Sequence, residues 1–345
     1  MRAVIFRAHG GLEVLEDADV PPPTPGPGEV LIRVKACGVN HLDIWIRQGI
    51  PAYRVTLPHI SGCDVAGVIE QLGPGVEQLR VGTPVFIAPG LSCFQCRSCQ
   101  AGLDNLCESY GIIGARTDGG YAELMTAPAQ NVIPIPEGVS FEDAAAFPLV
   151  FLTAWHMLVS RASLRSGERV LIHAAGSGVG HAAVQIAKLM GAVVYATVGS
   201  DAKLPHAKAL GADEVINYAR QDFPTSIREL TRGDGVDVVL EHVGPHTWEG
   251  SLRLLKKGGR LVTCGATTGA SVSLDLRYVF SRHLTILGSM MGTRNELLTI
   301  TQLIGQRRLK PVVDTVYPLQ QARAAQERLL KRQVFGKLVL RSERS

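Results

Sequence analysis

The chain has 345 residues and a formal net charge of +4, with 46% hydrophobic residues, 19% charged residues and 37 glycines. This balance is typical of a turn-rich globular protein and argues against disorder, and the length suits about two domains of roughly 150 residues. The basic residues are scattered and no run approaches the roughly 20 apolar residues of a membrane span, so we expect no nucleic-acid partner and no membrane partner. The start, MRAVIFRAHG, lacks the apolar core of a signal peptide, which predicts a cytoplasmic location.

Up to about residue 145 the pattern is typical of β-structure. Short apolar runs alternate with Gly and Pro breakers such as PPPTPGPGE and LGPGVEQLRVG. The runs expected to be strands are Val30–Val34, Val65–Leu72, Pro84–Ile87 and Tyr121–Met125. Many short strands separated by frequent turns predict a partly open barrel or a sandwich.

Four of the seven cysteines fall in the stretch SCFQCRSCQAGLDNLC, residues 92–107. In a reducing cytosol, clustered cysteines bind metal more often than they form disulfides. Four thiolates saturate tetrahedral zinc and leave no position for a substrate, so we predict one structural Zn²⁺ per chain. Its ligands are Cys93, Cys96, Cys99 and Cys107. The alternatives are four thiols without metal, and an iron–sulfur cluster, which needs a redox partner.

From about Gly167 the pattern alternates between strand and helix. The expected strands are Arg169–Ala174, Ala192–Val198, Glu214–Asn217, Val236–Glu241, Arg260–Gly265 and Leu284–Gly288. Parallel neighbours need crossover helices, so this alternation predicts a doubly wound parallel sheet. After about residue 290 a helical stretch and a last strand, Lys337–Leu340, remain.

The first strand of the alternating half runs into HAAGSGVG. A turn of small residues before a helix exposes backbone N–H groups to an anion and lets a pyrophosphate approach closely. The match to G-x-G-x-x-G is imperfect, because alanine and serine stand at the two earlier glycine positions. We interpret the turn as a dinucleotide site and not merely a packing loop. The residues predicted to form it are Ala175, Gly176, Ser177, Gly178, Val179 and Gly180.

The end of the second strand of this half reads ATVGSDAK. NAD-binding folds usually place an acid there for the 2′-hydroxyl of the adenosine, but Val198 and Gly199 occupy the positions. Ser200 and Lys203 follow and suit a 2′-phosphate, although Asp201 would oppose that phosphate if it pointed inward. The alternative for Lys203 is a solvated first-turn residue. We predict NADP(H), with NAD(H) as the alternative cofactor.

These motifs resemble the medium-chain dehydrogenase/reductase superfamily, which contains zinc alcohol dehydrogenases and zinc-independent quinone oxidoreductases. The similar segments are PGPGEVLIRVKACGVNHLD, GCDVAGVIEQLGPGV, the four-cysteine lobe with its C-x₂-C-x₂-C-x₇-C spacing, DGGYAE, AAGSGVG and FGKLVL, and the resemblance covers essentially the whole chain. It implies an α/β fold in which a GroES-like catalytic domain, residues 1–147 and 290–345 with the zinc lobe at about 90–110, is interrupted by a Rossmann domain, residues 148–289. It also implies an active site in the cleft between the domains, and homodimers or homotetramers built through the sheet edge at Leu284–Gly288.

The chain departs from the zinc alcohol dehydrogenases in the segments where those enzymes supply their catalytic ligands. Asn40 replaces the first Cys and Cys63 replaces the His, with Asp64 in the carboxylate position. The stretch PLVFL, residues 148–152, contains no ligating side chain. A catalytic zinc needs three protein ligands and one open position, which here requires an unfamiliar set such as His41, Cys63 and Asp64.

Asn40 in GVN resembles the quinone oxidoreductase branch, in which the substrate carbonyl sits beside the nicotinamide without metal. An amide can orient or polarise a carbonyl oxygen, and the alternative is an Asn that only caps a turn. His41 is a candidate proton donor or an exposed loop residue, and the resemblance implies that Thr153 faces the nicotinamide. Asp64 is expected to pair with Lys337 and to anchor the barrel.

The sequence therefore predicts an NADPH-dependent reductase that transfers hydride to a small-molecule quinone or α,β-unsaturated carbonyl without catalytic zinc. Two alternatives stay open. One is a zinc-dependent alcohol dehydrogenase with rearranged catalytic ligands, and the other is a non-catalytic nucleotide-binding protein.

Overall fold

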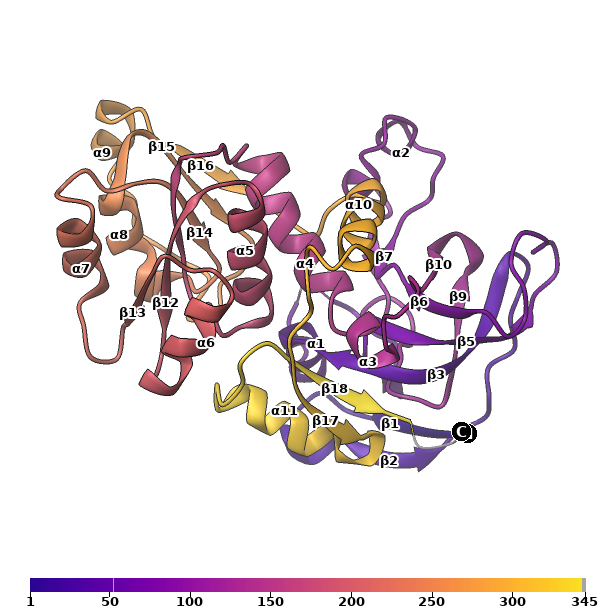
Figure 1. Ribbon diagram of the computed structural model, residues 1–345. Helices are drawn as coiled ribbons and strands as arrows, with labels where there is room; N and C mark the ends of the chain where they lie inside the picture. The colour runs from indigo at the N-terminus through magenta and orange to yellow at the C-terminus, as the bar shows by residue number, and fades with distance from the viewer. Residues whose placement is uncertain (52, 343–345) are drawn as a thin grey trace. The chain divides into compact units, whose positions relative to one another are not determined.

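The computed structural model describes residues 1–51 and 53–342 and divides into two compact units (Figure 1). The first unit is Met1–Leu149 with Thr293–Ser345, and the second is Val150–Gly292. Among the described residues, no helix is both long and apolar enough to span a bilayer.

The first unit is built on β-strands. Its seven-stranded sheet has the order β10 (Val132–Pro134), β6 (Pro84–Ile87), β5 (Asp64–Leu72), β3 (Glu29–Val39), β18 (Lys337–Arg341) and β17 (Val313–Pro318), and β9 (Leu124–Pro128) also pairs with β3. A second sheet has the order β2 (Glu16–Asp19), β1 (Arg2–Phe6) and β4 (His59–Ile60), and a third pairs β7 (Gly90–Leu91) with β8 (Gly111–Ile112). The C-terminal strand β18 thus joins the N-terminal half directly through β3.

Helical segments cover these sheets or connect their strands. The α-helices of this unit are α1 (His41–Gln48), α2 (Arg97–Gln100), α3 (Phe141–Ala144), α10 (Arg294–Gly305) and α11 (Ala322–Leu330). The 3₁₀ turns are η1 (Leu12–Val14), η2 (Asp104–Leu106), η3 (Ala129–Asn131) and η6 (Leu319–Gln321).

The strand predicted at Tyr121–Met125 begins later, at Leu124. The reason is a change of partner within the run. The carbonyl of Tyr121 accepts from Val4 N–H and the N–H of Glu123 donates to Arg2, so this part of the chain follows β1 before it crosses to β3 as β9. One apolar run therefore forms hydrogen bonds with strands of two different sheets.

The second unit confirms the predicted doubly wound sheet. Six strands, all parallel, have the order β13 (Glu214–Asn217), β12 (Val193–Val198), β11 (Arg169–Ile172), β14 (Val236–Glu241), β15 (Leu255–Thr263) and β16 (Thr285–Gly288). The helical segments begin with α4 (Pro148–Trp155), whose first two residues belong to the first unit. The others are a π-helical turn η4 (His156–Arg161), α5 (Gly178–Leu189), η5 (Asp201–Lys203), α6 (Leu204–Ala209), α7 (Phe223–Leu230), α8 (Pro245–Leu254) and α9 (Leu276–Ser281). In Figure 1, α7 and α8 lie on one face of this sheet and α5 on the other.

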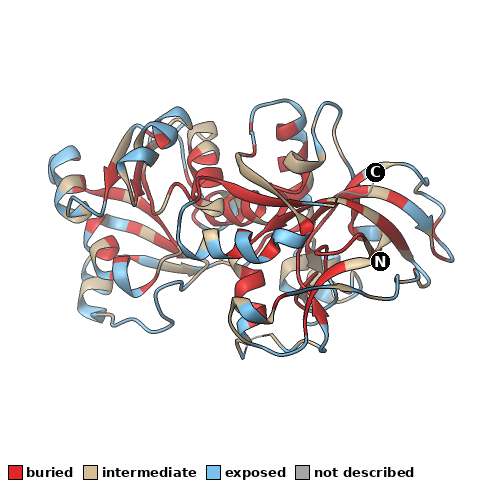
Figure 2. Cartoon of the chain, turned by 90° about the horizontal axis from the view of Figure 1, so that it is seen from below, coloured by how far each residue is buried: buried red, intermediate tan, exposed pale blue. Residues whose placement is uncertain are grey.

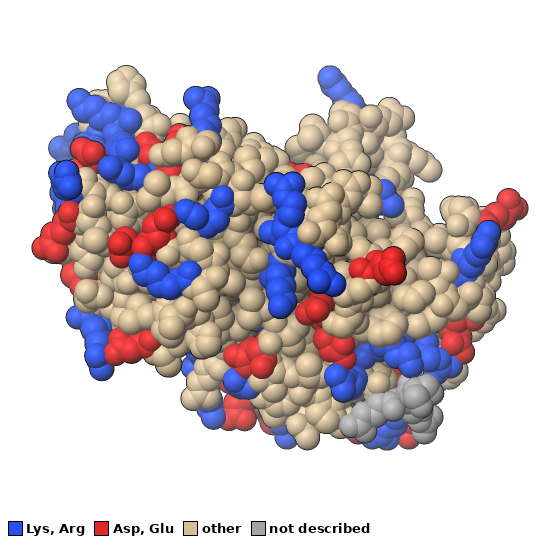
Figure 3. Space-filling model, viewed as in Figure 1, with Lys and Arg blue, Asp and Glu red and all other residues tan. Residues whose placement is uncertain are grey.

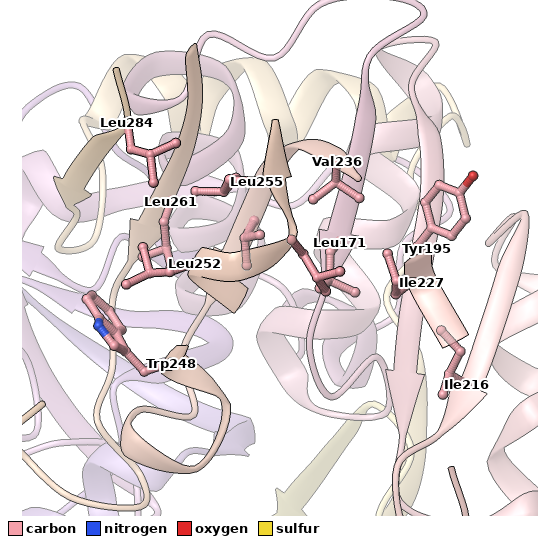
Figure 4. Close-up of a cluster of buried hydrophobic side chains, with 12 residues drawn as sticks. Leu171, Tyr195, Ile216, Ile227, Val236, Trp248, Leu252, Leu255, Leu261 and Leu284 are labelled. Atoms are coloured by element: carbon pink, nitrogen blue, oxygen red, sulfur yellow. The ribbon is translucent and has the colours of Figure 1, made fainter. Parts of the chain in front are cut away.

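The core of the second unit follows from this layering. Leu171 and Val239, on neighbouring strands, pack with Ile227 of α7 and with Trp248 and Leu252 of α8 (Figure 4). Figure 2 shows the strands as mostly buried while the helices turn an exposed face outward, as expected for a parallel sheet covered on both sides.

Polar residues fix where several helices begin. Ser177, Asp222 and Thr293 are the N-cap residues of α5, α7 and α10, and each side chain accepts a hydrogen bond from a backbone N–H of the first turn. Acidic and basic side chains are intermingled over the face shown in Figure 3. Ion pairs between exposed or half-buried side chains include Lys188 with Asp213.

Candidate functional site

Asn40 lies where three strands of the first unit meet. It follows the last residue of β3 and is the N-cap residue of α1. Strand pairing places Asp64, the first residue of β5, opposite Gly38, and pairs Leu338 of β18 with the last residue of β3. Lys337, which precedes Leu338, is thereby brought to Asn40 from the far end of the sequence.

Asn40, Asp64 and Lys337 form one buried network, with residue exposures of 5%, 0% and 2%. The Nζ of Lys337 donates to Oδ1 of Asn40 at 2.6 Å and to Oδ2 of Asp64 at 3.0 Å. The Nδ2 of Asn40 donates to the same Asp64 oxygen at 2.9 Å and contacts Cys63 Sγ at 3.4 Å, and Asp64 Oδ1 accepts from Leu149 N–H at 2.8 Å. The predicted Asp64–Lys337 pair is confirmed. Because an ammonium only donates, it also fixes the orientation of the Asn40 amide.

A second buried carboxylate, Asp43, stands one helical turn further on. Its Oδ2 accepts from the N–H of Asn40 at 2.7 Å and from the hydroxyl of Tyr121 at 3.0 Å. Its Oδ1 is buried without a hydrogen-bond partner among the described residues. Burial raises the pKa of Asp43 from 3.8 to about 6, because the charged form has lost its hydration.

Asp43→Asn is expected to stabilise the first unit at alkaline pH. The pKa of Asp43 is raised on folding, so the folded state binds more protons than the unfolded state between about pH 4 and pH 6, and stability is lost as pH rises through that window. Two pKa units correspond to about 3 kcal/mol. Asparagine keeps an acceptor oxygen for Asn40 and Tyr121 and removes this charge.

Urea unfolding of the native protein and the variant at pH 8 and pH 4 measures the effect. The gain in free energy of unfolding should be largest at pH 8 and should shrink toward pH 4. A difference that does not change with pH would contradict the assignment of a raised pKa to Asp43.

The four cysteines of residues 93–107 converge as predicted. Their sulfur atoms all lie within 4.8 Å of one another, and the contacts Cys96–Cys99, Cys93–Cys107 and Cys93–Cys99 measure 3.6, 3.5 and 4.0 Å. A tetrahedron with Zn–S bonds of about 2.3 Å has edges of about 3.8 Å, so this set fits Zn²⁺. Among residues 1–51 and 53–342, it is the one group of three or more His, Cys, Asp or Glu side chains arranged to hold a metal ion.

The surroundings of the sulfur atoms differ in how far they favour a thiolate before metal binds. Backbone N–H groups of Cys93 and Cys96 donate to the sulfurs of Cys107 and Cys93, each at 3.3 Å. The Ser109 hydroxyl, followed by the Cys93 N–H, lowers the pKa of Cys107 to about 6, whereas desolvation raises the pKa of Cys99 to about 12. A divalent cation favours the deprotonated form of every ligand, so the four residues would bind zinc as thiolates.

The turn predicted to bind the dinucleotide connects β11 to α5 in the second unit. Ala174 adopts a left-handed conformation with φ of 48°, and the Ser177 hydroxyl accepts from Gly180 N–H at 2.9 Å. A Cβ atom on Gly180 would lie 2.2 Å from the carbonyl oxygen of Ala174, so only glycine lets the helix approach the turn this closely. The N–H groups of Gly178 and Val179 belong to the first turn of α5, where backbone N–H groups have no acceptor within the helix. Free N–H groups at a helix N-terminus can bind a phosphate.

After β12, both oxygens of the Asp201 carboxylate have partners. Asp201 Oδ1 accepts from Asn217 Nδ2 at 2.6 Å, and Oδ2 forms an ion pair with Arg220 at 2.6 Å. A Cβ atom on Gly199 would lie 2.6 Å from the hydroxyl oxygen of Tyr218. Asn217, Tyr218 and Arg220 were not predicted as site residues from the sequence. The available signal was their position at the carboxyl end of β13, the neighbour of β12 in a parallel sheet.

The remaining predicted residues are distributed over both units. His41 is half-buried at the start of α1, and its ring centroid lies 6.2 Å from that of Trp45. Thr153 is buried within α4 of the second unit. Ser200 and Lys203 are half-buried, at the N-cap and the last position of η5. The catalytic and cofactor-binding roles of these residues stay predictions.

Comparison with known families agrees with this architecture. Residues 26–137 match the family model described as the alcohol dehydrogenase GroES-like domain. Residues 178–306 match the model described as zinc-binding dehydrogenase. The GroES-like domain of the predicted fold class is therefore confirmed alongside the parallel sheet.

Individual relatives span almost the full length. An alcohol dehydrogenase of Geobacillus stearothermophilus is 37% identical over 95% of this chain and 96% of its own length. A quinone oxidoreductase of Rattus norvegicus is 32% identical over 99% of this chain and 97% of its own. A solved structure of an NAD-dependent alcohol dehydrogenase is 50% identical, with a TM-score of 0.95 over 99% of each chain. The chain belongs to the medium-chain dehydrogenase/reductase superfamily and is an NAD(P)-dependent oxidoreductase.

Proposed function

We propose that this oxidoreductase is an NADPH-dependent reductase of quinones or α,β-unsaturated carbonyls, and that it works without a catalytic zinc. The observation that carries the proposal is the buried Lys337 ammonium, 2.6 Å from Asn40 and 3.0 Å from Asp64. Asn40, Cys63 and Asp64 stand in the segments that resemble the ligand-bearing segments of the zinc enzymes. Here the Lys337 ammonium already donates to Asn40 and Asp64, two of these three residues.

Two physical arguments weigh against a metal ion beside this ammonium. At roughly 4 Å and an effective dielectric constant of about 20, two unit charges repel by about 4 kcal/mol, and a divalent ion by about twice that. The donor set is also poor. Burial raises the pKa of Cys63 well above that of an ordinary thiol and so disfavours the thiolate, and both oxygens of Asp64 already accept hydrogen bonds.

The same network prepares the Asn40 amide to donate. One strong bond of Nδ2 goes to Asp64, and its other contacts, to Cys63 Sγ and the carbonyl of Gly38, are both 3.4 Å long. Sulfur is a weak acceptor, so a carbonyl oxygen that gains negative charge would compete well for that hydrogen. The dinucleotide supplies the hydride when it is bound. The amide would stabilise the enolate or phenolate oxygen that results.

Asn40→Ala is expected to lower kcat for quinones and enones by about ten- to a hundredfold, the loss of roughly one good hydrogen bond to developing charge. Cys63→Ala is the matched control, because it removes the sulfur acceptor and leaves the amide in place, and its kcat should change less than about threefold. Steady-state kinetics of the native protein and both variants, with the quinone or enone varied and NADPH saturating, measure both effects. The measurements are made on folded protein before and after brief chelation.

The relatives are named as alcohol dehydrogenases and as quinone oxidoreductases, so alcohols should be tested as substrates alongside quinones and enones. Two of the relatives reported above are alcohol dehydrogenases and one is a quinone oxidoreductase. Fast turnover of ethanol or a longer primary alcohol, lost on chelation and restored by zinc, would overturn the proposal in favour of an alcohol dehydrogenase with rearranged ligands.

The preference for NADPH over NADH is supported by the end of β12. The carboxylate of Asp201 forms an exposed ion pair with Arg220 and accepts a hydrogen bond from Asn217, so it is tied to the neighbouring strand end and not left as an unpaired charge beside Ser200. With no acid at the position that usually accepts from a 2′-hydroxyl, the local charge suits a 2′-phosphate better.

Lys203→Ala is expected to weaken NADPH binding about tenfold or more and to leave NADH binding nearly unchanged, because only NADPH carries the 2′-phosphate. Titration of cofactor fluorescence with both dinucleotides gives the two dissociation constants. Equal affinities of the unmodified protein for NADPH and NADH would sink the cofactor preference.

The proposed assembly into dimers or tetramers through the edge of the parallel sheet also stays a prediction. β16 forms that edge within the described unit, and α9, which precedes it, exposes Leu276 and Phe280. Apolar side chains beside an open strand edge are typical of a surface that another subunit covers.

A further inference from the structure

Four polar side chains are completely buried beneath the dinucleotide turn of the second unit. Thr197 belongs to β12, His173 follows β11, Glu241 ends β14 and Ser251 lies in α8, and none is more than 1% exposed. Burying such groups costs free energy unless they bond to one another. The ring of His173 lies with Nδ1 3.3 Å from Thr197 Oγ1 and Nε2 2.8 Å from Ser251 Oγ, and Ser251 donates to Glu241 Oε2 at 3.1 Å.

The direction of this chain of hydrogen bonds can be assigned. Ser251 has a single hydroxyl proton and gives it to Glu241, so Nε2 of His173 must donate to Ser251. Burial lowers the pKa of His173 to about 4, so the ring is neutral at physiological pH and its Nδ1 is an acceptor. The Thr197 hydroxyl therefore donates to Nδ1. Every donor in the chain points the same way, toward Glu241.

The two ends of the chain hold two different loops. At one end, Thr197 Oγ1 accepts from the N–H of Ala174, the residue of the dinucleotide turn with a left-handed backbone. At the other end, Glu241 Oε1 accepts from the N–H groups of Val243 at 2.6 Å and Gly244 at 3.1 Å, in the loop that leads to α8. β11 and β14 are neighbours, and in doubly wound folds dinucleotides bind beyond the carboxyl ends of such strands.

We propose that Thr197, His173, Ser251 and Glu241 are positioning residues for the dinucleotide, acting as one hydrogen-bonded chain that fixes the turn at Ala174 relative to the loop at Val243–Gly244. This inference rests on the proposed binding of the dinucleotide at that turn. None of the four side chains needs to touch the cofactor. A left-handed alanine is strained, and it persists only where neighbouring bonds hold it. Without the Thr197 hydroxyl, the turn would relax and the N–H groups aimed at the pyrophosphate would lose their common orientation.

Thr197→Val tests the proposal, since valine has nearly the same shape and lacks the hydroxyl. The dissociation constants for NADPH and NADH should rise together by about tenfold, because the pyrophosphate is common to both, while kcat at saturating cofactor stays within about threefold. Thr197→Ser restores the hydroxyl and should recover most of the affinity. The matched control is Thr225→Val, which removes an exposed threonine hydroxyl from α7 and should leave both constants unchanged.

A spectroscopic readout separates positioning from general destabilisation. In ¹⁵N-labelled protein, His173 should stay neutral with its proton on Nε2 between pH 8 and pH 5.5. His173→Gln, which keeps a donor near the Nε2 position but not the acceptor for Thr197, supplies a second variant if Thr197→Val does not fold, and it should weaken both dinucleotides as well. A proton on Nδ1 of His173, or unchanged affinity for both dinucleotides in folded Thr197→Val, would overturn the proposal that these residues position the dinucleotide as one hydrogen-bonded chain. Failure of the unmodified protein to bind either dinucleotide would instead overturn the proposed function. The tautomer of His173 would still show whether the hydrogen bonds run in the assigned direction.

Discussion

Lys337→Met is expected to lower the free energy of unfolding of the first unit by about 3–5 kcal/mol, the usual cost of removing one partner from a buried ion pair. Lys337 and Asp64 are almost completely inaccessible to solvent, so the carboxylate of Asp64 would stay in the interior without its cation. Asn40 Nδ2 and Leu149 N–H would still donate to it, but neither carries a charge. Urea unfolding measures the change.

A double-mutant cycle shows whether the loss comes from the unpaired charge. Asp64→Asn combined with Lys337→Met removes both charges, so the double variant should be more stable than Lys337→Met alone. Lys331→Met is the matched control, because Lys331 pairs with Glu327 on the exposed face of α11 and should cost less than about 1 kcal/mol. Additive losses in the cycle would show that Lys337 and Asp64 do not depend on each other.

The same variant also bears on the catalytic proposal. If the ammonium orients the Asn40 amide, any Lys337→Met protein that folds should lose activity toward quinones even at saturating substrate. Full activity in such protein would mean that the Asn40–Asp64–Lys337 network stabilises the first unit and has no role in catalysis.

Features that depend on residues close together in the sequence could be predicted from it. The cysteines of residues 93–107 lie close in the chain, so their convergence follows from one short loop. The turn before α5 is contiguous too, and a Cβ atom on Gly180 would lie 2.2 Å from the carbonyl oxygen of Ala174, while the role of this turn in binding the dinucleotide stays a prediction. The Asp64–Lys337 pair was predicted across the length of the chain, but its hold on Asn40 was not. That contact depends on the register of β18 against β3, which local patterns do not fix.

The contacts that the sequence analysis missed lie at the ends of neighbouring parallel strands. Arg220 follows β13, yet it forms an ion pair with Asp201 after β12. His173 and Glu241 each appear in the sequence as one polar residue at the end of an apolar run, VLIH and VVLE, and Ser251 and Thr197 look like ordinary helix and strand residues. Such residues come together only when the order of strands is known. A polar side chain ending a buried strand was the signal that could have led to them.

Cys96→Ser is expected to abolish stoichiometric zinc binding and to unfold the lobe at residues 90–110. The four sulfurs lie within 4.8 Å of one another, near the edge of about 3.8 Å of a zinc tetrahedron, and a structural zinc contributes its binding free energy to folding, about 10–16 kcal/mol in isolated zinc-finger peptides. In this chain the lobe is attached to a large unit, so we expect the loss to appear as local unfolding. Limited proteolysis should cut the variant within residues 90–110 much faster than the native protein.

Elemental analysis of the same preparations gives the number of zinc ions per chain. We expect one in the native protein, none in Cys96→Ser, and one in the control Cys264→Ser, whose thiol lies in the second unit outside the lobe. Two zinc ions in the native protein would contradict the assignment of one metal site and would favour a catalytic zinc at His41, Cys63 and Asp64. Four thiolates would leave a zinc bound in the lobe no open position, so loss of this metal should reduce activity only as far as it reduces the amount of folded protein.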